Sequence, residues 1–594
     1  MFILRRNTLA VAFLYLTIAA HCAWAMDPYA VTVEQGVVVK MRDGAALRAD
    51  IYRPKADGNF PVLLERTPYD KSGSSSFGRR AAALGYVVIA QDVRGRYTSD
   101  GEWYPFKHES SDGFDTVEWA ASLPYSDGRV GMFGGSYVGA TQMLAAIAQP
   151  PHLAGICPVV TASNYHDGWT YQGGAFEQWF NESWASGLAE DTLNRAVRSK
   201  TNALNGIWKL PLTAYPLFEL PAAAADADLT HSLAPYFLDW LAHPDYDGYW
   251  KAWSIEEHFS DIKVPMLTVA AWYDIFLGGS LRNYIGMKAH GGSDAARRGQ
   301  RLLVTIGGHA GSGRKIGDVD FGPSADFSEN DVILGWYDHL FKNATNEFAS
   351  AQPVRIFVMG ANEWRNEDDW PLRRVRQERY FLHSRGKANS GTGDGTLSSA
   401  SPRTESPDHY LYDPTNPAPT AGGPLCCDSQ HLQPGPRDQR PVETRMDVLV
   451  YSTPVLSQDL EVTGPVTVEL FASSSASDTD FTAKLVDVWP NGFAQNLTEG
   501  IIRARYRDSQ EKSTPLNPGQ TYKLALDLWA TSNVFGKGHQ LRLEISSSNF
   551  PRFDRNLNTG ENAAYARKSV PATNTIYHDT EHPSSLVLPV VPNQ

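Results

Sequence analysis

Apolar runs and helical patterns alternate in the first part of the chain, from about residue 30 to 160. Near-continuous apolar runs of strand length occur at residues 47–52, 60–66 and 86–92. A helical pattern at 113–123 follows them. Apolar strands that alternate with helices are typical of a parallel sheet covered by helices on both faces. We therefore expect an α/β domain here.

The alternation stops at about residue 161 and resumes at about 263. Strand-like runs are absent in between, residues 222–228 look helical, and seven of the sixteen tryptophans fall in this segment: Trp169, Trp179, Trp184, Trp208, Trp240, Trp250 and Trp253. We interpret the segment as an inserted helical cap, in which most tryptophans pack the helices together. The resumed α/β pattern comprises strands at 264–274 and 301–309 and helices at 277–290 and 330–340.

After about residue 352 the chain consists of short strands separated by turn-rich segments. The strand-like runs are 354–359, 380–383, 448–451, 466–471, 481–488 and 540–545. Many short strands with few helix signals predict a β-sandwich of jelly-roll type. The predicted divisions are a signal peptide (1–25), an α/β domain in two parts (26–160 and 263–350), the cap (161–262) and the jelly roll (351–594).

The N-terminus has the pattern of an export signal. Arg5 and Arg6 precede an apolar run at 8–20, and Ala23-Trp-Ala25 offers a small-x-small cleavage site. The run is shorter than the roughly 20 residues of a comfortable membrane span. We expect a cleaved signal peptide, an exported protein (periplasmic or secreted) and no later membrane span; a retained anchor is the alternative.

Charge and cysteine content narrow the function further. The net charge of −13, without a long basic run, argues against nucleic acid as a partner. Signal cleavage would leave Cys157, Cys426 and Cys427, too few for a disulfide framework. Cys157 lies in an apolar segment and is predicted to be buried. The adjacent pair is either a local disulfide or two free thiols, and no cluster of metal ligands lies near it.

The segment 129–139 predicts a reactive serine. It reads as a short strand, a glycine-rich corner and the first turn of a helix, with Ser136 at the corner. Glycines at 134, 135 and 139 would let the backbone and the helix approach closely, as in a nucleophile elbow. The alternative is an ordinary strand-to-helix turn in which Ser136 caps the helix.

Two further strand ends carry the groups that a nucleophilic serine requires. A serine hydroxyl needs a base, and the base works best when a carboxylate orients it. Asp274 and His309 end predicted strands of the same domain, and functional groups gather at such ends in parallel sheets. The order Ser, Asp, His is that of α/β-hydrolases. Such a triad needs no metal and no organic cofactor; for Asp274 alone, helix capping is the alternative.

Acyl transfer also needs hydrogen-bond donors for the developing oxyanion. In an elbow the backbone N–H after the nucleophile, here that of Tyr137, is one donor. Tyr69 follows the predicted strand 60–66, where its phenol is placed to supply a second. The alternative is that Tyr69 is an ordinary tyrosine of a surface loop.

These residues carry a family resemblance. The motifs Gly134-x-Ser136-Tyr137-x-Gly139, 66–71 and 272–274 resemble the serine hydrolases grouped with cocaine esterase, glutaryl-cephalosporin acylase, α-amino-acid ester hydrolases and X-Pro dipeptidyl-peptidases. Segments 92–101, 478–481, 484–488 and 538–542 match too, although Tyr97 stands where a glycine is usual. The resemblance implies an α/β-hydrolase domain, a helical cap and a jelly roll. It also implies Ser136, Asp274 and His309 as the triad, with Tyr69 and the Tyr137 amide as the oxyanion hole.

The expected substrate is a small-molecule carboxylic ester. The α-amino-acid ester hydrolases carry two acids shortly after the catalytic aspartate, but residues 275–277 are Ile-Phe-Leu here, and a desolvated ammonium without carboxylates would be costly. Asp167 is the one acid left for that role. Phe276, Trp169 and Trp179 are predicted to line an apolar acyl pocket. Amide hydrolysis is the runner-up, and a binding protein with a vestigial hydrolase domain is a remote alternative; the oligomeric state is not predicted.

Overall fold

The computed structural model describes residues 28–189, 191, 207–208, 210–214, 233–309 and 313–592. The predicted signal peptide and the helical pattern at 222–228 lie outside these ranges. Within them, no helix combines the length and the apolar character needed to cross a bilayer.

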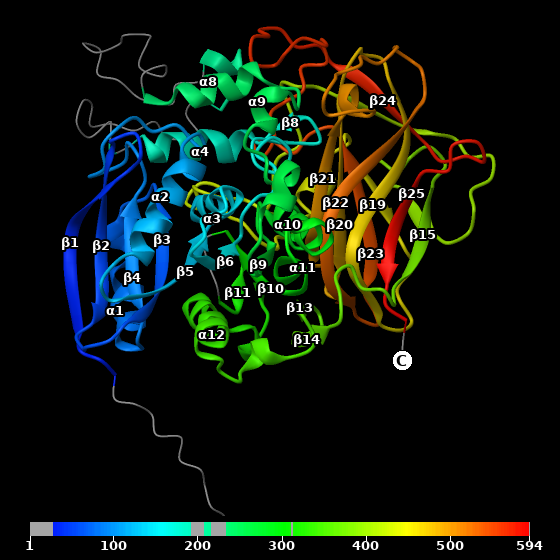
Figure 1. Cartoon of the computed structure of the whole chain (residues 1–594). Coiled ribbons are helices and arrows are strands. Elements are labelled where there is room, and N and C mark those ends of the chain that lie inside the picture. Colours follow the sequence, from blue (N-terminus) through cyan, green and yellow to red (C-terminus); the bar gives the residue numbers. More distant parts are fainter. Residues whose placement is uncertain are drawn as a thin grey trace, which may run out of the picture.

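A ten-stranded sheet forms the first half of the molecule (Figure 1). Its strands are β1 (Val31–Lys40), β2 (Ala46–Pro54), β3 (Phe60–Thr67), β4 (Val87–Asp92), β5 (Ser126–Gly135), β6 (Leu153–Val159), β9 (Met266–Tyr273), β10 (Gln300–Gly308), β13 (Val354–Val358) and β14 (Glu363–Glu367). They are ordered β1-β2-β4-β3-β5-β6-β9-β10-β13-β14. The centre from β4 to β13 is parallel, and the outer pairs are antiparallel. The predicted α/β domain is confirmed.

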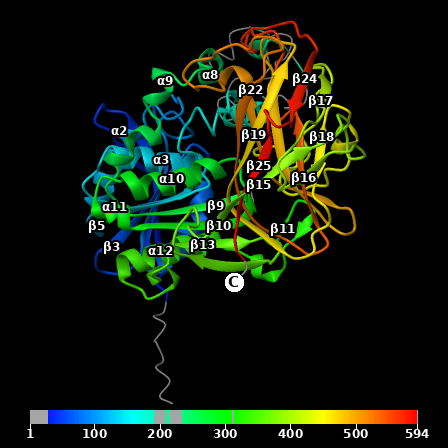
Figure 2. The same ribbon diagram turned by 90° about the vertical axis from the view of Figure 1, so that its right-hand side faces the viewer.

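Helices cover both faces of this sheet (Figure 2). They are α1 (Ser75–Ala83), α2 (Glu109–Ala121), α3 (Tyr137–Ile147), α10 (Leu277–His290), α11 (Asp294–Arg298) and α12 (Glu329–Lys342). Alternation along β3 divides the two cores: Val62 and Leu64 pack with α2 and α3, whereas Leu63 packs with α1 and α12. Apolar residues on both faces explain why these strands read as continuous hydrophobic runs.

One predicted strand joins a different sheet from the one expected. Residues 354–359 were assigned to the β-rich region, but β13 pairs in parallel with β10, Val354 opposite Leu302, and β14 then closes the edge. A short apolar strand carries no mark of its partner, because pairing depends on long-range packing. The sequence pattern predicts none of the strands β1, β6, β14, β16, β17, β21, β22, β24 and β25 individually.

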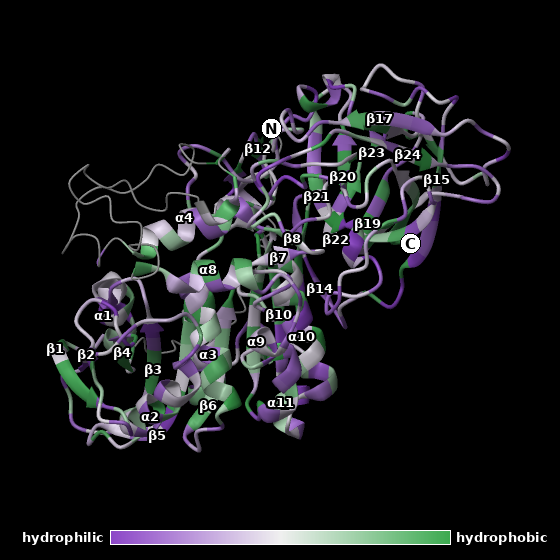
Figure 3. Ribbon diagram, turned by 90° about the horizontal axis from the view of Figure 1, so that it is seen from above, coloured by the Kyte–Doolittle hydropathy of each residue, from purple (hydrophilic) through white to green (hydrophobic). Residues whose placement is uncertain are grey.

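The second half of the chain is a β-rich domain built around an eleven-stranded sheet. Its strands are β15 (Arg376–His383), β16 (Thr396–Ser398), β17 (Asp408–Tyr412), β18 (Leu449–Ser452), β19 (Leu460–Ser474), β20 (Asp480–Val488), β21 (Ala494–Arg503), β22 (Tyr522–Phe535), β23 (Gln540–Ser546), β24 (Ala572–Tyr577) and β25 (Ser585–Val590). All pairs are antiparallel except β16 with β18. These strands carry both hydrophobic and hydrophilic residues (Figure 3), as is usual for strands that bury one face.

The described part of the predicted cap contains helices, as expected, and a short pair of strands that was not expected. It contains α4 (Gln178–Leu188), α8 (Pro235–Ala242), α9 (Gly248–Lys251) and the two-residue strands β7 (Tyr171–Gln172) and β8 (Ala175–Phe176). These elements lie above the α/β domain, next to the β-rich domain (Figure 1). Backbone bonds join them to that domain: the N–H of Trp179 donates to Pro551 O at 3.1 Å. A short hairpin, β11 (Lys315–Ile316) and β12 (Val319–Asp320), follows β10.

Candidate active site

Ser136 lies at the corner between β5 and α3 in an unusual backbone conformation. Its φ and ψ are 60° and −127°, a region that residues other than glycine rarely adopt. The N–H of Ser136 donates to Val159 O at 2.9 Å, and Thr161 Oγ1 donates to Ser136 O at 2.8 Å. These bonds from the adjacent strand hold the corner in place. The Ser136 side chain makes no capping bond to α3, so the helix-cap alternative is wrong.

Two of the three glycines around Ser136 are required by close contacts. A Cβ on Gly134 would lie 2.4 Å from Val138 Cγ1, and Gly134 has a φ of 123°. A Cβ on Gly139 would lie 2.7 Å from Thr161 Cβ. At Gly135 the nearest atom would be 3.5 Å away, an ordinary contact. The expectation of close approach therefore holds at 134 and 139 but not at 135.

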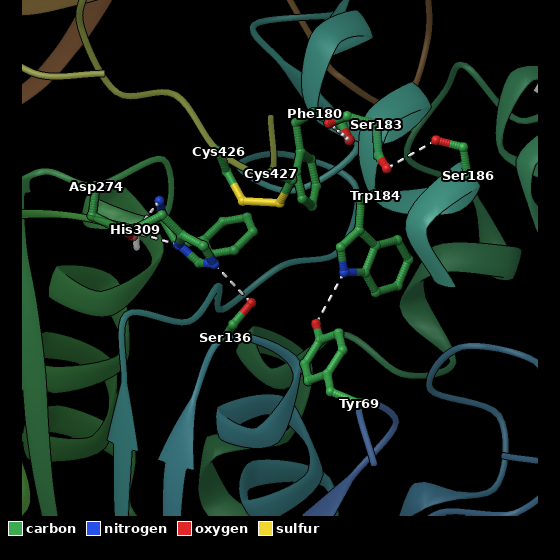
Figure 4. The surroundings of a disulfide bond; sticks show 11 residues. Tyr69, Ser136, Phe180, Ser183, Trp184, Ser186, Asp274, His309, Cys426 and Cys427 are labelled. Carbon is green, nitrogen blue, oxygen red and sulfur yellow. Dashed lines mark hydrogen bonds and ion pairs between the residues drawn. A yellow bond between two sulfur atoms is a disulfide. The ribbon is translucent and has the colours of Figure 1, made fainter. Parts of the chain in front are cut away.

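His309 and Asp274 lie in line with Ser136, as the strand ends predict (Figure 4). His309 Nε2 lies 2.8 Å from Ser136 Oγ, and His309 Nδ1 lies 2.7 Å from Asp274 Oδ2. Asp274 is fully buried, and its other oxygen accepts from the N–H of Phe276 at 2.7 Å. The carboxylate thus fixes the start of α10 as well as the imidazole.

These contacts indicate which nitrogen of the His309 imidazole carries the proton. The Asp274 carboxylate is an acceptor, so the proton of a neutral imidazole belongs on Nδ1. Nε2 then keeps its lone pair toward Ser136 Oγ and can accept the hydroxyl proton. The arrangement suits removal of a proton from Ser136 during nucleophilic attack.

Tyr69 lies on the other side of Ser136 from His309 (Figure 4). Trp184 Nε1 donates to its hydroxyl oxygen at 3.0 Å. An indole N–H only donates, so the phenol hydrogen of Tyr69 remains available for another acceptor. Loss of solvation around the hydroxyl raises the pKa of Tyr69, opposed by Trp184, by the Ser136 hydroxyl and by the Tyr137 amide. The phenol therefore stays protonated, and it lies near Ser136 and near the Tyr137 amide, the other predicted oxyanion-hole donor.

Tyr137 is anchored by a buried polar network beneath the corner. Its hydroxyl donates to Glu109 Oε1 at 2.9 Å and accepts from the N–H of Phe106 at 2.8 Å. Glu109 also accepts from Arg66 Nη1 at 2.8 Å. Burial raises the pKa of Glu109, and Arg66 opposes the rise. Since Tyr137 begins α3, this network fixes an amide of the first helical turn, where N–H groups have no acceptor within the helix.

Ser136 and His309 open onto a cavity of about 600 Å³. The α/β domain, the cap and the β-rich domain all contribute to its lining, which comprises Tyr69, Arg96, Tyr97, Gly135, Ser136, Val160, Ser183, Trp184, Gly187, Leu188, His309, Glu329, Cys426 and Cys427.

Tyr97, which replaces the usual glycine, has a φ of 44°, in the left-handed region that glycine favours. Cys426 and Cys427 form a disulfide, which resolves the alternative left open by the sequence. Cys157 is free and buried, as predicted.

The three aromatic residues predicted for the pocket lie behind its surface. Phe276 meets the His309 ring edge-on at 5.0 Å and stacks on Trp169 at 4.4 Å, and both are fully buried. Trp179 is also buried and packs with Leu425 of the β-rich domain. The tryptophan that does line the cavity is Trp184. Its place depends on the rotation of α4, which the spacing of tryptophans does not define.

The acid considered for binding an ammonium group is already engaged. Asp167 accepts from Arg282 Nη1 at 2.9 Å and does not line the cavity. Burial would raise the pKa of Asp167, but Arg282 outweighs that effect and lowers it. The carboxylate that lines the cavity is Glu329, at the start of α12, whose pKa is raised by burial against the opposing effect of His309.

Family models match both halves of the chain. Residues 43–311 match the X-Pro dipeptidyl-peptidase (S15 family) model, and residues 346–587 match the X-Pro dipeptidyl-peptidase C-terminal non-catalytic domain. Cocaine esterase from Rhodococcus sp. (strain MB1 Bresler) is 40% identical over 580 residues, covering 94% of this chain and 99% of that protein.

Solved structures share the whole fold. An aminopeptidase from the marine sediment archaeon Thaumarchaeota archaeon has a TM-score of 0.79 at 26% identity, covering 99% of both chains. An α-amino acid ester hydrolase also has a TM-score of 0.79, at 24% identity, covering 98% of this chain and 100% of the other. The likeness extends through the α/β part and the β-rich part alike.

Proposed function

The chain belongs to the X-Pro dipeptidyl-peptidase (S15) family and is a serine hydrolase, and on that premise we propose that it cleaves carboxylic esters through an acyl-enzyme formed on Ser136. The observation that carries the proposal is the continuous contact of Ser136 Oγ, the His309 imidazole and the Asp274 carboxylate, at 2.8 and 2.7 Å. The identity to cocaine esterase over almost the full length supports an ester as the substrate.

The proposed reaction has two halves. Ser136 Oγ attacks the ester carbonyl while His309 Nε2 takes the hydroxyl proton, and Asp274 stabilises the imidazolium. The carbonyl oxygen becomes an oxyanion that accepts from the Tyr69 hydroxyl and the Tyr137 N–H. His309 then gives its proton to the departing alcohol. Water, deprotonated by His309, releases the acid and restores Ser136.

The oxyanion assignment rests on where the two donors lie. Tyr69 has its oxygen bound by Trp184, so its hydrogen is free to meet the oxyanion. The Tyr137 amide belongs to the first turn of α3, where the helix dipole favours negative charge. Each such donor contributes on the order of 3–4 kcal/mol in the transition state.

Covalent labelling of Ser136 tests the function. A fluorophosphonate should label the purified protein at Ser136, as located by peptide mass spectrometry. Ser136→Ala should lower kcat on a p-nitrophenyl ester by about 10⁶, because removal of a triad serine abolishes the covalent route. Serine alkoxide formation depends on His309, so His309→Ala should suppress labelling as well. An active Ser136→Ala protein would contradict the proposal.

Amide hydrolysis is the second candidate, favoured by the similarity to an archaeal aminopeptidase. The two reactions share every step of the mechanism and differ in the leaving group. Comparison of kcat/KM on a p-nitrophenyl ester and the matched p-nitroanilide separates them. We expect the ester to be preferred; preference for the anilide would favour the acylase or peptidase function.

Two finer features belong to the same proposal. The N-terminal pattern of residues 1–25 supports export with cleavage after Ala25, which N-terminal sequencing of the protein made in a secreting host would test. The eleven-stranded, largely antiparallel sheet supports a jelly-roll description of the β-rich domain.

A further inference from the structure

The Cys426–Cys427 disulfide is part of the wall of the cavity that holds Ser136 and His309. Cys426 is 5% exposed and belongs to the same hydrophobic cluster as Trp184 and Phe276. Cys427 is exposed, so the disulfide has one buried and one accessible side. In Figure 4 it lies above Ser136, between the side of His309 and the side of Trp184.

The loop that carries the disulfide is fixed at its base and at both flanks. Gly423 and Gly435 exchange backbone hydrogen bonds of 2.8 and 2.9 Å, which close the loop. Leu425 packs with Trp179 of α4. At the other flank, Pro434 lies next to Gly308 of β10, because a Cβ built on that glycine would be 3.8 Å from Pro434 Cβ. The β-rich domain therefore holds the disulfide at a defined position between the cap and the end of β10.

The backbone at the disulfide is itself unusual. Cys427 has a φ of 78°, in the left-handed region that residues with a Cβ rarely adopt. Side chains of adjacent residues ordinarily point in different directions, whereas the bond between Cys426 and Cys427 holds both sulfurs in one apolar unit. Uncommon backbone conformations of this kind persist where the surroundings enforce them, and they concentrate at functional sites.

In the proposed function the positions of the carbonyl oxygen and of the leaving oxygen of the ester are assigned, and the position of the acyl group remains to be assigned. The carbonyl oxygen points toward Tyr69 and the Tyr137 amide, and the leaving oxygen must lie near His309, which supplies the proton. The acyl group then extends toward the rest of the lining, of which the disulfide, above Ser136 in Figure 4, is a part. Trp184 flanks this direction and offers an apolar face.

We propose that the Cys426–Cys427 disulfide is a specificity-determining wall of the acyl subsite, against which a flat or branched apolar acyl group packs. The inference rests on the proposed ester hydrolysis and goes beyond it by assigning the acyl chemistry to a feature of the β-rich domain. It also makes the subsite sensitive to reduction. A dithiol such as dithiothreitol supplies two electrons and two protons, converting the disulfide to two thiols while becoming a cyclic disulfide. Cys427 is then released from Cys426, and the wall loses its shape.

Two esters with the same leaving group test the proposal. Full-length protein is assayed on p-nitrophenyl acetate and p-nitrophenyl benzoate, before and after reduction by dithiothreitol that mass spectrometry verifies. A Cys426→Ala/Cys427→Ala variant is assayed in parallel. We expect kcat/KM for the benzoate to fall about tenfold or more in both cases, as losses in an apolar pocket do. For the acetate, which is too small to reach the wall, kcat/KM should change less than about threefold.

The controls separate this inference from structural damage and from the proposed function. Dithiothreitol should not change the selectivity of the double-alanine variant, because its wall contains no disulfide. A parallel loss on both esters, or an unchanged benzoate-to-acetate ratio, would overturn the assignment while Ser136 labelling and acetate turnover keep the proposed function. If the untreated protein turns over neither ester and Ser136 is not labelled, the proposed function fails, and the subsite with it.

Discussion

At the scale of single residues, the hydrogen bond that Tyr69 accepts from Trp184 determines which hydrogen bond Tyr69 can donate. Trp184 donates to the phenol oxygen, so the phenol hydrogen of Tyr69 remains available, and in the proposed reaction its acceptor is the oxyanion formed above Ser136. The exposed fraction of Tyr69 is 40%, because its ring borders the open cavity. Tyr69 thus lines the cavity, which its predicted role requires and an ordinary surface-loop tyrosine would not.

Tyr69→Phe should therefore act on the transition state more than on binding. We expect kcat on a p-nitrophenyl ester to fall about 10²–10³-fold with a smaller change in KM, as loss of one oxyanion donor does. Steady-state kinetics of the purified variant measures both constants. Tyr380→Phe, on β15 of the β-rich domain, is the matched removal of a phenol and should leave both unchanged. An unaltered kcat in Tyr69→Phe would remove Tyr69 from the oxyanion hole.

The residues that sequence reasoning brought together share one property. Asp274, His309 and Ser136 each end a strand of the parallel sheet, and the ends of such strands meet at one edge, so their meeting follows from local patterns. No comparable local pattern predicts that Trp184 and Cys426 lie at the cavity. The first faces the cavity through the rotation of α4, and the second arrives from a loop of another domain. Both depend on long-range packing that the local sequence does not encode.

At the scale of elements, the strand-corner-helix unit around Ser136 stores an uncommon backbone conformation that neighbouring contacts enforce. The Gly134 φ of 123° and the closeness of Val138 leave no room for a side chain, whereas Gly135 has room. Two adjacent glycines in one motif thus differ in what they contribute. The difference gives a matched pair of substitutions.

Gly134→Ala should be much more harmful than Gly135→Ala. We expect Gly134→Ala to lower the free energy of unfolding by about 1–3 kcal/mol, because a Cβ at 2.4 Å from Val138 must be accommodated at a positive φ. Gly135→Ala should cost less than about 1 kcal/mol. Urea denaturation followed by tryptophan fluorescence compares the two. Equal losses would show that the corner does not depend on the conformation of Gly134.

Elements themselves were predictable where one pattern was long and regular. The predicted helix 277–290 coincides with α10, and the predicted strand 301–309 differs from β10 by one residue at each end. The sheet to which a strand belongs was less predictable: β13 pairs with β10 in the first sheet, although its short apolar run resembles those of the β-rich domain. Register and partner are set by packing between distant segments, not by periodicity.

At the scale of the whole molecule, the cap and the β-rich domain are joined by buried charge. Arg552, fully buried, donates to Glu499 and to Gln172, and lies 3.4 Å from Glu177, just before α4. Burial raises the pKa of Glu177 to about 7, with Arg552 opposing the rise. The protonated form of this side chain is therefore the one that the folded molecule favours below neutral pH.

The raised pKa of Glu177 should make the free energy of unfolding depend on pH. A carboxyl whose pKa is raised on folding contributes stability fully below its unfolded pKa, near 4.5, and loses that contribution as pH rises through about 7. The free energy of unfolding of the native protein relative to Glu177→Gln should thus decline between pH 4.5 and 7, by roughly 3 kcal/mol at most. Thermal melts of both proteins across this range measure it. Glu102→Gln, at an exposed site, is the control, and a constant difference would contradict the assignment.

The helix α10 lies between the two halves of the molecule (Figure 1) and packs against both through apolar side chains. Leu277, Leu281 and Tyr284 of α10 share one hydrophobic cluster with Leu528 and other core residues of the β-rich domain. The start of this helix follows directly from Asp274. The packing between domains therefore supports the segment that positions the imidazole, although neither half of the sequence alone indicates that contact.

The loop closed by Gly423 and Gly435 supplies part of the cavity wall from a distant part of the chain. Ser136, Asp274 and His309 all precede it, and Cys426 follows His309 by 117 residues. The reacting groups and this part of the wall can therefore vary independently. Under the proposed function, substitutions in the loop are a route by which acyl preference can change while the reacting residues stay the same.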